Sequence, residues 1–360
     1  MLKVLTWEIK NKGNKIMKKY ENVDYIKGAQ NLLDTFELKS NDGLVIMSAE
    51  ANLDYSNILS KAAKDKGFKN ILFILLPDAL RPITKIPDIL HNILDNSKAM
   101  IVSFDRHYEE IFTFMRPLSE LCRKKRVRHV VTLEPSEKYF KEGIGANYMV
   151  VKEKTEKLKE IIKESENIEV ISELGTNLKF EIYKDIAART PFFDSGDYRN
   201  QAPEGELMTC PVEETFNGKL IVDGPITGMG KPPKEPTELE FKNGQIAKVK
   251  GNEDFIVKLL NKIQISDKRV KTLKGAWVGE FAIGTNEWAK LDYNLSNCEK
   301  VAGAIHIAFG KTCGASIGNF LGEDRGETFH IDNIATNCTI TVNKKNGEKV
   351  IVVKSGKLLI

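Results

Sequence analysis

The sequence predicts an N-terminal α/β domain, with a parallel sheet and flanking helices, and a larger α+β C-terminal domain that is mostly antiparallel β. In the first half, uniformly apolar runs alternate with longer amphipathic stretches, which is typical of β-α-β units. Beyond residue 167 the runs become short and alternate between apolar and polar residues, as half-buried antiparallel strands do. We therefore predict a Rossmann-like domain over residues 1–166 and a β-rich domain over residues 167–360.

In the first domain, strands and helices are predicted in strict alternation. In chain order they are a strand at 44–47, a helix at 57–66, a strand at 71–76, a helix at 86–94, a strand at 100–102, a helix at 112–124, a strand at 129–133 and a helix at 151–164. The last helix is rich in Lys and Glu, and we expect it to connect the two domains. Neither a GxGxxG nor a GxxxxGK[ST] motif follows the first strand, so no nucleotide site is predicted.

The second domain is predicted to consist of short antiparallel strands joined by tight turns. Examples of these strands are 178–182, 220–222 and 239–241. Asn-Gly pairs begin at positions 217, 243 and 346, and such pairs favour two-residue hairpins because both residues tolerate positive φ angles. One amphipathic helix is predicted at 254–264 and another around 288–291.

The composition is that of a folded protein without a strong charge bias. Of the 360 residues, 41% are hydrophobic and 29% are charged, and the net charge is only +4, which implies no particular partner. The basic cluster at 123–128 lies at the end of a predicted helix and contains no aromatic residues, so we expect no nucleic-acid partner.

Two further features bear on location. No segment has the pattern of a secretion signal and no apolar run reaches the length of a membrane span, so we expect a cytoplasmic protein without a membrane partner. The five cysteines are widely spaced and form no CxxC pair, which predicts reduced thiols rather than a disulfide framework.

Two histidines in the second half are candidate metal ligands. His330 and Asp332 are separated by one residue, so in an extended strand their side chains point to the same face and can bind one ion. His306 interrupts the apolar run 303–310, which glycines flank. Each histidine alone has an ordinary interpretation as a half-buried, hydrogen-bonded imidazole, so the prediction depends on the whole set.

Acidic residues enter apolar, glycine-bracketed segments at two places. Glu206 follows Glu204 and Gly205, and Glu280 follows Gly279. Both positions have an ordinary interpretation as carboxylates exposed at a strand end. For Glu280 a metal ligand is the more attractive interpretation, whereas for Glu204 a solvent-exposed turn is an equal alternative.

Taken in order, several segments resemble the aminopeptidase T and aminopeptidase S group of metallo-exopeptidases. These segments are Gly175-Thr176-Asn177-Leu178, Pro203-Glu204-Gly205-Glu206, Asn217-Gly218, 279–286, His306-Ile307-Ala308-Phe309-Gly310 and His330-Ile331-Asp332. The resemblance covers nearly the whole chain in outline, but its discriminating motifs lie between about residues 175 and 332.

The resemblance implies a two-metal aminopeptidase whose catalytic domain is the β-rich one. It assigns the metal ligands to Glu206, Glu280, His306, His330 and Asp332, with Zn, Co or Mn as the two divalent ions. A metal-activated water would hydrolyse the N-terminal amide bond of a small peptide or amide substrate, with Glu206 and Glu204 as catalytic carboxylates and Glu204 also a candidate for binding the α-amino group. The resemblance also implies a homodimer.

Alternatives use the same residues differently. The family has a tyrosine seven residues after the first histidine, whereas this sequence has Cys313, which is either a packing residue, a soft metal ligand or the mark of a changed reaction. His306, His330 and Asp332 also form the 2-His-1-carboxylate set of a mononuclear Fe(II) dioxygenase, and ring-opening dihydroxypyridine dioxygenases are similar to the aminopeptidase T group in their C-terminal halves.

Two other hypotheses are a related amide-processing biosynthetic enzyme and a scaffold that binds its ligand without turnover. The presence of Glu206 and Glu280 favours the two-metal hydrolase.

Overall fold

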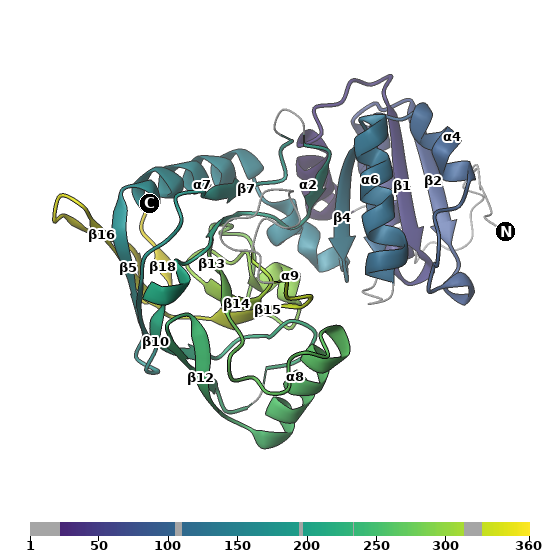
Figure 1. Ribbon diagram of the computed structural model, residues 1–360. Coiled ribbons are helices and arrows are strands. Elements are labelled where there is room, and N and C mark those ends of the chain that lie inside the picture. Colours follow the sequence, from purple (N-terminus) through teal and green to yellow (C-terminus); the bar gives the residue numbers. More distant parts are fainter. Residues whose placement is uncertain (1–21, 105–109, 194–196, 233, 313–325) are drawn as a thin grey trace. The chain divides into compact units, whose positions relative to one another are not determined.

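The computed structural model describes residues 22–104, 110–193, 197–232, 234–312 and 326–360, and the chain forms two compact units (Figure 1). The first comprises Met1–Tyr148 and Thr190–Glu204, and the second comprises Met149–Arg189 and Gly205–Ile360. One unit holds a parallel sheet with flanking helices and the other holds mostly antiparallel sheets, so the predicted fold class is confirmed.

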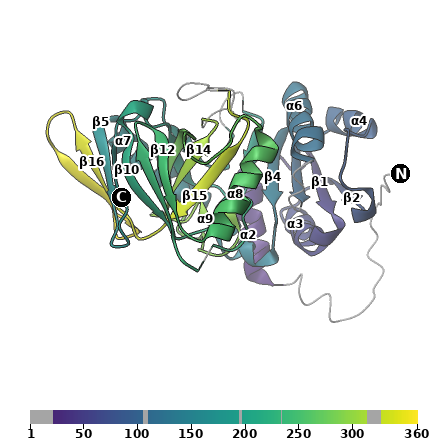
Figure 2. The ribbon, with the colours of Figure 1, turned by 60° about the horizontal axis from the view of Figure 1, so that its bottom comes forward.

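The first unit is built on a parallel sheet. Its strands, in spatial order, are β2 (Asn70–Leu76), β1 (Gly43–Ala49), β3 (Ala99–Phe104), β4 (Arg128–Leu133) and β8 (Arg199–Gln201). β1 and β3 are almost wholly buried, because helices cover both faces of the sheet. The covering helices are α2 (Val23–Asp34), α3 (Leu53–Asp65), α4 (Ile89–Asp95) and α6 (Arg116–Lys125), and Figure 2 shows α3 on the opposite side of the sheet from α4 and α6.

Local sequence fixes the ends of these helices. Asn22 caps α2, since its side chain accepts hydrogen bonds from the backbone of Asp24 and Tyr25. Helix α6 has Pro117 in its first turn and three basic residues in its last turn, where they are favourable near the negative end of the helix dipole. Residues 123–125 of the basic cluster thus form the C-terminal end of a helix, as predicted, while Arg128 begins strand β4.

The second unit contains two antiparallel sheets. The larger sheet runs β12 (Gln245–Lys250), β11 (Thr237–Lys242), β10 (Asn217–Val222), β6 (Asn177–Phe180), β5 (Ser165–Ile171), β16 (Thr339–Lys344), β17 (Lys349–Lys354) and β18 (Lys357–Leu358). The smaller sheet runs β15 (His330–Ala335), β14 (Ile305–Gly310), β13 (Val278–Gly284), β9 (Glu206–Thr209) and β7 (Ala187–Arg189). The unit also holds α7 (Tyr148–Lys163), α8 (Glu253–Ser266) and α9 (Leu295–Cys298).

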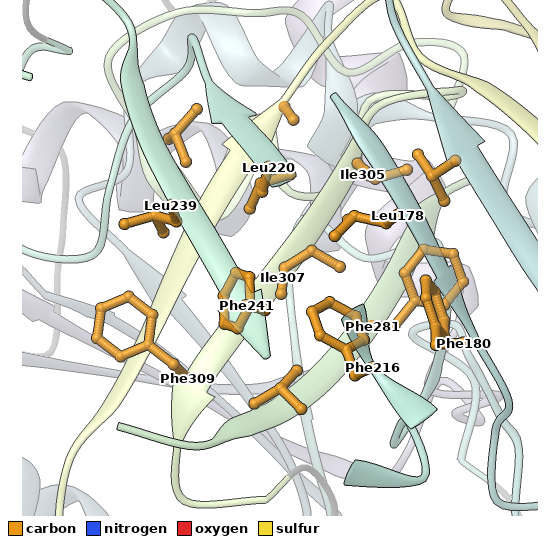
Figure 3. Close-up of a cluster of buried hydrophobic side chains, with 14 of the residues drawn as sticks. Leu178, Phe180, Phe216, Leu220, Leu239, Phe241, Phe281, Ile305, Ile307 and Phe309 are labelled. Carbon is orange, nitrogen blue, oxygen red and sulfur yellow. The ribbon is translucent and has the colours of Figure 1, made fainter. Parts of the chain in front are cut away.

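The core of the second unit lies between its two sheets (Figure 3). Phe180, Phe216 and Phe241 come from the side of the larger sheet, while Phe281 and Phe309 come from β13 and β14 of the smaller one. Phe180 contacts Phe281 edge to face, with ring centroids 5.0 Å apart. One face of the smaller sheet is therefore committed to packing, which leaves its other face for polar side chains.

Three details differ from the sequence prediction. The expected boundary at residues 166 and 167 is not the observed division, because α7 buries Leu158 and Ile162 in the second core and β8 returns to pair with β4. No helix forms at 288–291, and a short helix forms instead at α9, whose start Asn294 caps.

The third detail concerns the Asn-Gly pairs. Asn243-Gly244 connects β11 to β12 with positive φ at both residues, and the pair at 346 lies between β16 and β17, so both are hairpin turns as predicted. Asn217-Gly218 instead opens strand β10. A Cβ on Gly218 would lie 2.1 Å from the carbonyl oxygen of Asn177, so glycine is required there by the close approach of β6 rather than by a turn.

Among the described residues no helix is both long and apolar enough to span a bilayer. Cys122, Cys210, Cys298 and Cys338 are buried free thiols.

Candidate metal centre

Strand register gathers the predicted ligands on one face of the smaller sheet. Glu280 on β13 and Asp332 on β15 both lie opposite Ala308, which is on the strand between them. His306 lies two residues before Ala308 on β14, and successive side chains alternate along a strand, so His306 points to the same face as Ala308. Glu206 enters this face from β9, the next strand beyond β13.

The sequence alternates in size along these strands. Ala282 and Gly284 follow Glu280 on its face, and Ala308 and Gly310 follow His306 on the same face. Their small side chains leave room for the polar groups, whereas Phe281, Ile307 and other large residues on the opposite face fill the core. The same alternation that builds the core therefore keeps the polar face open.

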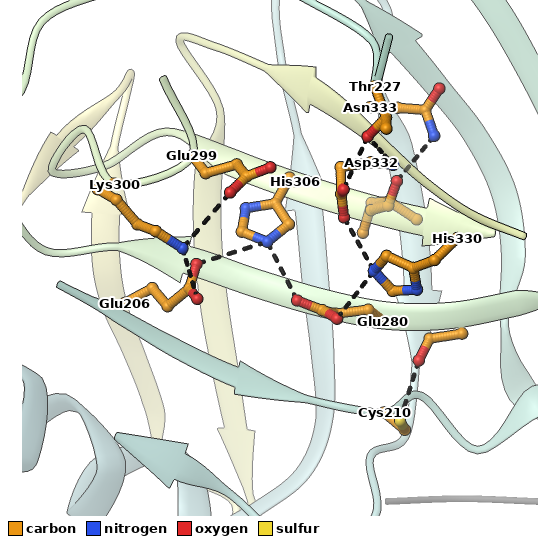
Figure 4. Close-up of polar contacts among 12 residues, drawn as sticks. Glu206, Cys210, Thr227, Glu280, Glu299, Lys300, His306, His330, Asp332 and Asn333 are labelled. Carbon is orange, nitrogen blue, oxygen red and sulfur yellow. Dashed lines mark hydrogen bonds and ion pairs between the residues drawn. The ribbon is translucent and has the colours of Figure 1, made fainter. Parts of the chain in front are cut away.

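The two imidazoles face one carboxylate (Figure 4). Oε1 of Glu280 lies 3.1 Å from Nε2 of His306, and Oε2 lies 3.3 Å from Nε2 of His330. Nε2 of His330 also lies 3.0 Å from Oδ1 of Asp332. Glu280 and His306 are buried, and Asp332 is 9% exposed, so these contacts lie largely out of water.

On the other side of His306, Glu206 is held by a buried lysine. Nζ of Lys300 lies 2.6 Å from Oε1 of Glu206 and 3.5 Å from Oε2 of Glu299. The second oxygen of Glu206 lies 3.6 Å from Nε2 of His306. Lys300 is only 1% exposed, and its ion pair with Glu206 is one of the most deeply buried charged contacts of the described chain.

Burial and pairing act in opposite directions on these groups. Burial alone raises the pKa of Glu280 and Asp332, but hydrogen bonds and charges from the two histidines outweigh it and bring both pKa values below their usual range. Burial likewise lowers the pKa of His306 and His330, and the neighbouring carboxylates outweigh it and raise both. The carboxylates and the imidazoles thus favour each other's charged forms, and these nitrogens would have to be deprotonated to act as metal ligands.

Hydrogen bonds from outside the cluster orient its members. The hydroxyl of Thr227 donates to Oδ2 of Asp332 at 2.8 Å and accepts from the backbone N–H of Asp332 at 2.9 Å. Nδ1 of His330 lies 2.5 Å from the carbonyl oxygen of Lys311, so it carries the proton and Nε2 faces the carboxylates. Gly279 permits this contact, because a Cβ there would lie 2.7 Å from the same carbonyl oxygen.

The donor set suits a divalent metal ion. Ligand atoms of Glu280, His306 and Asp332 all lie within 4.8 Å of one another, and His330 contacts two of these residues. Mixed imidazole and carboxylate donors are used for iron, zinc and manganese. The residues present therefore fit a metal ion.

The structure brings together Glu206, Glu280, His306, His330 and Asp332, all predicted as ligands from the sequence, although metal binding by them stays a prediction. Glu204 belongs to the first unit, where it is buried rather than exposed and where its charge lies near the phenol of Tyr148. Its catalytic role also stays a prediction. Cys313 lies outside the described residues.

Sequence reasoning missed Lys300, Glu299 and Thr227. A signal for the first two was present, since the charged pair Glu299-Lys300 directly precedes the apolar segment that contains His306. Thr227 lies in a loop 105 positions before Asp332, and nothing in its local sequence indicates that it belongs to the site.

Fold and site together define a protein with an α/β unit and an antiparallel unit, the second of which carries a cluster of carboxylates and imidazoles suited to a metal ion. The chain belongs to the family described as 2,5-dihydroxypyridine 5,6-dioxygenase (NicX), which matches residues 112–359. No curated protein matches the chain.

Two solved structures share the fold. A 2,5-dihydroxypyridine dioxygenase from Pseudomonas putida KT2440 superposes with a TM-score of 0.66 at 15% identity, over 93% of this chain and 96% of that one. Wild-type AmpT from Thermus thermophilus also gives 0.66 at 15% identity, over 94% of this chain and 99% of that one. The resemblance to aminopeptidase T is thus confirmed as a likeness of fold, whereas the family that matches is the dioxygenase family.

Proposed function

We propose that this enzyme is a mononuclear non-haem iron(II) dioxygenase that opens a hydroxylated aromatic ring. The observation that carries the proposal is the convergence of His306, His330 and Asp332 from the adjacent strands β14 and β15, because two imidazoles and one carboxylate are the ligand set of this class. Membership of a family described as a ring-cleaving dioxygenase supports the same chemistry.

In this mechanism the residues of the chain bind and orient the reacting groups, and one of them accepts a proton. Bound Fe(II) would supply redox chemistry with dioxygen and open positions for substrate. His330 is fixed by the carbonyl of Lys311, and Asp332 by Thr227, so both present their ligand atoms without rearrangement. Glu280 is not needed as a ligand in this set, and its carboxylate lies beside both imidazoles, where it is placed to accept the proton of an acidic ring hydroxyl.

A second candidate function is the two-metal amide hydrolase expected from the sequence. Its supporting observation is that the two oxygens of Glu280 face different histidines, so that Glu280 would be able to contribute one oxygen to each of two ions. Glu206 with His306 would then hold one ion, and His330 with Asp332 the other. Under this hypothesis the ions would polarise an amide carbonyl and lower the pKa of a bound water.

Metal content and substrate class separate the two functions. The protein would be purified without oxygen, saturated separately with Fe(II), Zn(II) and Mn(II), and assayed for oxygen uptake with dihydroxylated pyridines and benzenes and for hydrolysis of aminoacyl amides. About one iron per chain and oxygen uptake with a hydroxylated ring support the dioxygenase. About two ions per chain and amide turnover would replace it with the hydrolase.

Two variants connect the result to the site. His330→Ala should abolish both metal retention and turnover, because it removes an imidazole that contacts Glu280 and Asp332. His91→Ala is the matched control, since His91 is an exposed histidine of the first unit. Equal metal content in both variants would contradict the assignment of this site.

A further inference from the structure

We propose that the ammonium of Lys300 takes the place of a second metal ion beside Glu206 and so limits the cluster to one ion. This inference rests on the proposed mononuclear site and adds the residue that determines its nuclearity. Its basis is the buried contact between Lys300 and Glu206, the ligand that a second ion would need most (Figure 4).

Glu206 is the residue whose binding to metal would distinguish a two-ion site from a one-ion site. Glu280, His306, His330 and Asp332 contact one another directly or through Glu280. Glu206 lies at one end of the cluster, with one oxygen 3.6 Å from His306 and the other 2.6 Å from Nζ of Lys300. The carboxylate thus already has a positive charge at hydrogen-bond distance, on the side where a further cation would bind.

Two hydrogen bonds hold the backbone of Lys300. Its carbonyl accepts from the N–H of Asn286 at 2.9 Å, and its own N–H donates to Asn297 at the end of α9 at 3.2 Å. Gly284 makes this position accessible, because a Cβ there would lie 2.2 Å from the carbonyl oxygen of Val301 and 2.8 Å from the carbonyl carbon of Lys300. The loop after α9 therefore packs directly on the end of β13 and directs the lysine inward.

The positive charge of Lys300 opposes the binding of a second cation at Glu206. A buried ammonium is tolerated only when it is paired, and Lys300 lies near both Glu206 and Glu299. A divalent cation bound at Glu206 would be repelled strongly at this short range in a medium of low dielectric constant, and it would also have to displace the ammonium from its partner. We expect the second ion to bind at least ~100-fold more tightly when the charge of Lys300 is removed.

The test is the metal content of Lys300→Met, which keeps most of the side-chain length and removes the charge. After saturation with Zn(II) and removal of excess, elemental analysis should give about one ion per chain for the parent protein and about two for K300M. The double variant K300M/E206Q should return to about one ion, because the carboxylate that K300M exposes is gone. Lys290→Met is the control, since Lys290 is an exposed lysine nearby in sequence.

The outcomes are distinguishable. One ion in both the parent protein and K300M overturns this inference and leaves the mononuclear site standing. Two ions in the parent protein overturn the mononuclear site itself.

A second variant keeps the inference testable if K300M does not fold. Glu206→Gln should retain one ion with an affinity within ~10-fold of the parent protein, because Glu206 is occupied by Lys300 and is not a ligand. Loss of the ion in E206Q would show that Glu206 binds metal and would refute the inference. Isothermal titration with Zn(II) measures both affinity and stoichiometry without any assay of turnover.

Discussion

Removing one hydroxyl group tests how the side chain of Asp332, a predicted metal ligand, is held in place. Thr227→Val preserves the shape of the side chain and deletes only the group that donates to Oδ2 of Asp332 and accepts from its backbone N–H, at 2.8 and 2.9 Å. Both interactions end on a residue that is 9% exposed, so little water is available to replace them. The variant should therefore affect both the stability of the fold and the affinity for metal.

The two effects have different sizes. A hydrogen bond to a charged group contributes about 1.5–3 kcal/mol, and leaving a backbone N–H without a partner costs about 1–3 kcal/mol. These terms share one residue and do not add fully, so we expect a loss of about 2–4 kcal/mol in the free energy of unfolding. Loss of a group that orients a ligand typically weakens metal binding by about 10- to 100-fold.

Urea unfolding without metal measures the first effect, and competition against a chromogenic chelator measures the second. Thr336→Val is the matched control, because the hydroxyl of Thr336 donates to Oδ2 of Asp223 at 2.6 Å at the end of the same strand. It should cost similar stability and leave metal affinity unchanged. Equal metal affinity in T227V and T336V would refute the orienting role of Thr227.

Two further perturbations address the frame around the site. Burial, together with the charge of Arg199, lowers the pKa of His129 to about 3 from its ordinary 6.5, so its contribution to stability is complete above pH 6.5 and is lost as the pH falls towards 3. Between pH 6.5 and 5 this loss is about 2 kcal/mol in the free energy of unfolding. His129→Gln should remove this pH dependence from urea-unfolding data, whereas His91→Gln, at an exposed position, should leave it unchanged. Equal pH slopes in the two variants would contradict the role given to His129. Gly218→Ala should cost more than about 2 kcal/mol in the free energy of unfolding, because its Cβ would lie 2.1 Å from a backbone oxygen and φ is +119°. Gly347→Ala, where the added Cβ has open space, should cost about 1 kcal/mol from its positive φ alone. Similar losses in chemical unfolding would count against the explanation by close approach of β6.

The fold was predictable where the hydrophobic pattern was uniform over a whole element. The buried parallel strands β1 and β3 have continuous apolar sequences, and α8 has a clear amphipathic period, so local sequence determined them. The predictions failed where a contact distant in sequence decided the outcome. Asn217-Gly218 has the composition of a turn, but the approach of β6 places it in a strand.

In the site, too, local features were predictable from the sequence and contacts between distant segments were not. His330 and Asp332 share a face because they are two residues apart on one strand, which the sequence shows directly. The proximity of Glu280 to Asp332 depends on the pairing of β13, β14 and β15, which the sequence alone does not give. Lys300 was missed because its burial depends on a loop packing against Gly284, so neither residue alone marks it as part of a site.

The same fold occurs in solved structures with different names, one a 2,5-dihydroxypyridine dioxygenase and one AmpT. Ligand positions are set by strand register, which also sets the aromatic core on the opposite face, so a change in register would destroy the fold together with the site. The charge at the end of the cluster is set instead by the loop that carries Lys300, outside the strands of the sheet. If Lys300 excludes a second ion as we propose, a substitution in this loop would remove the positive charge beside Glu206 without disturbing the core, and the number of bound ions would change while the fold is retained.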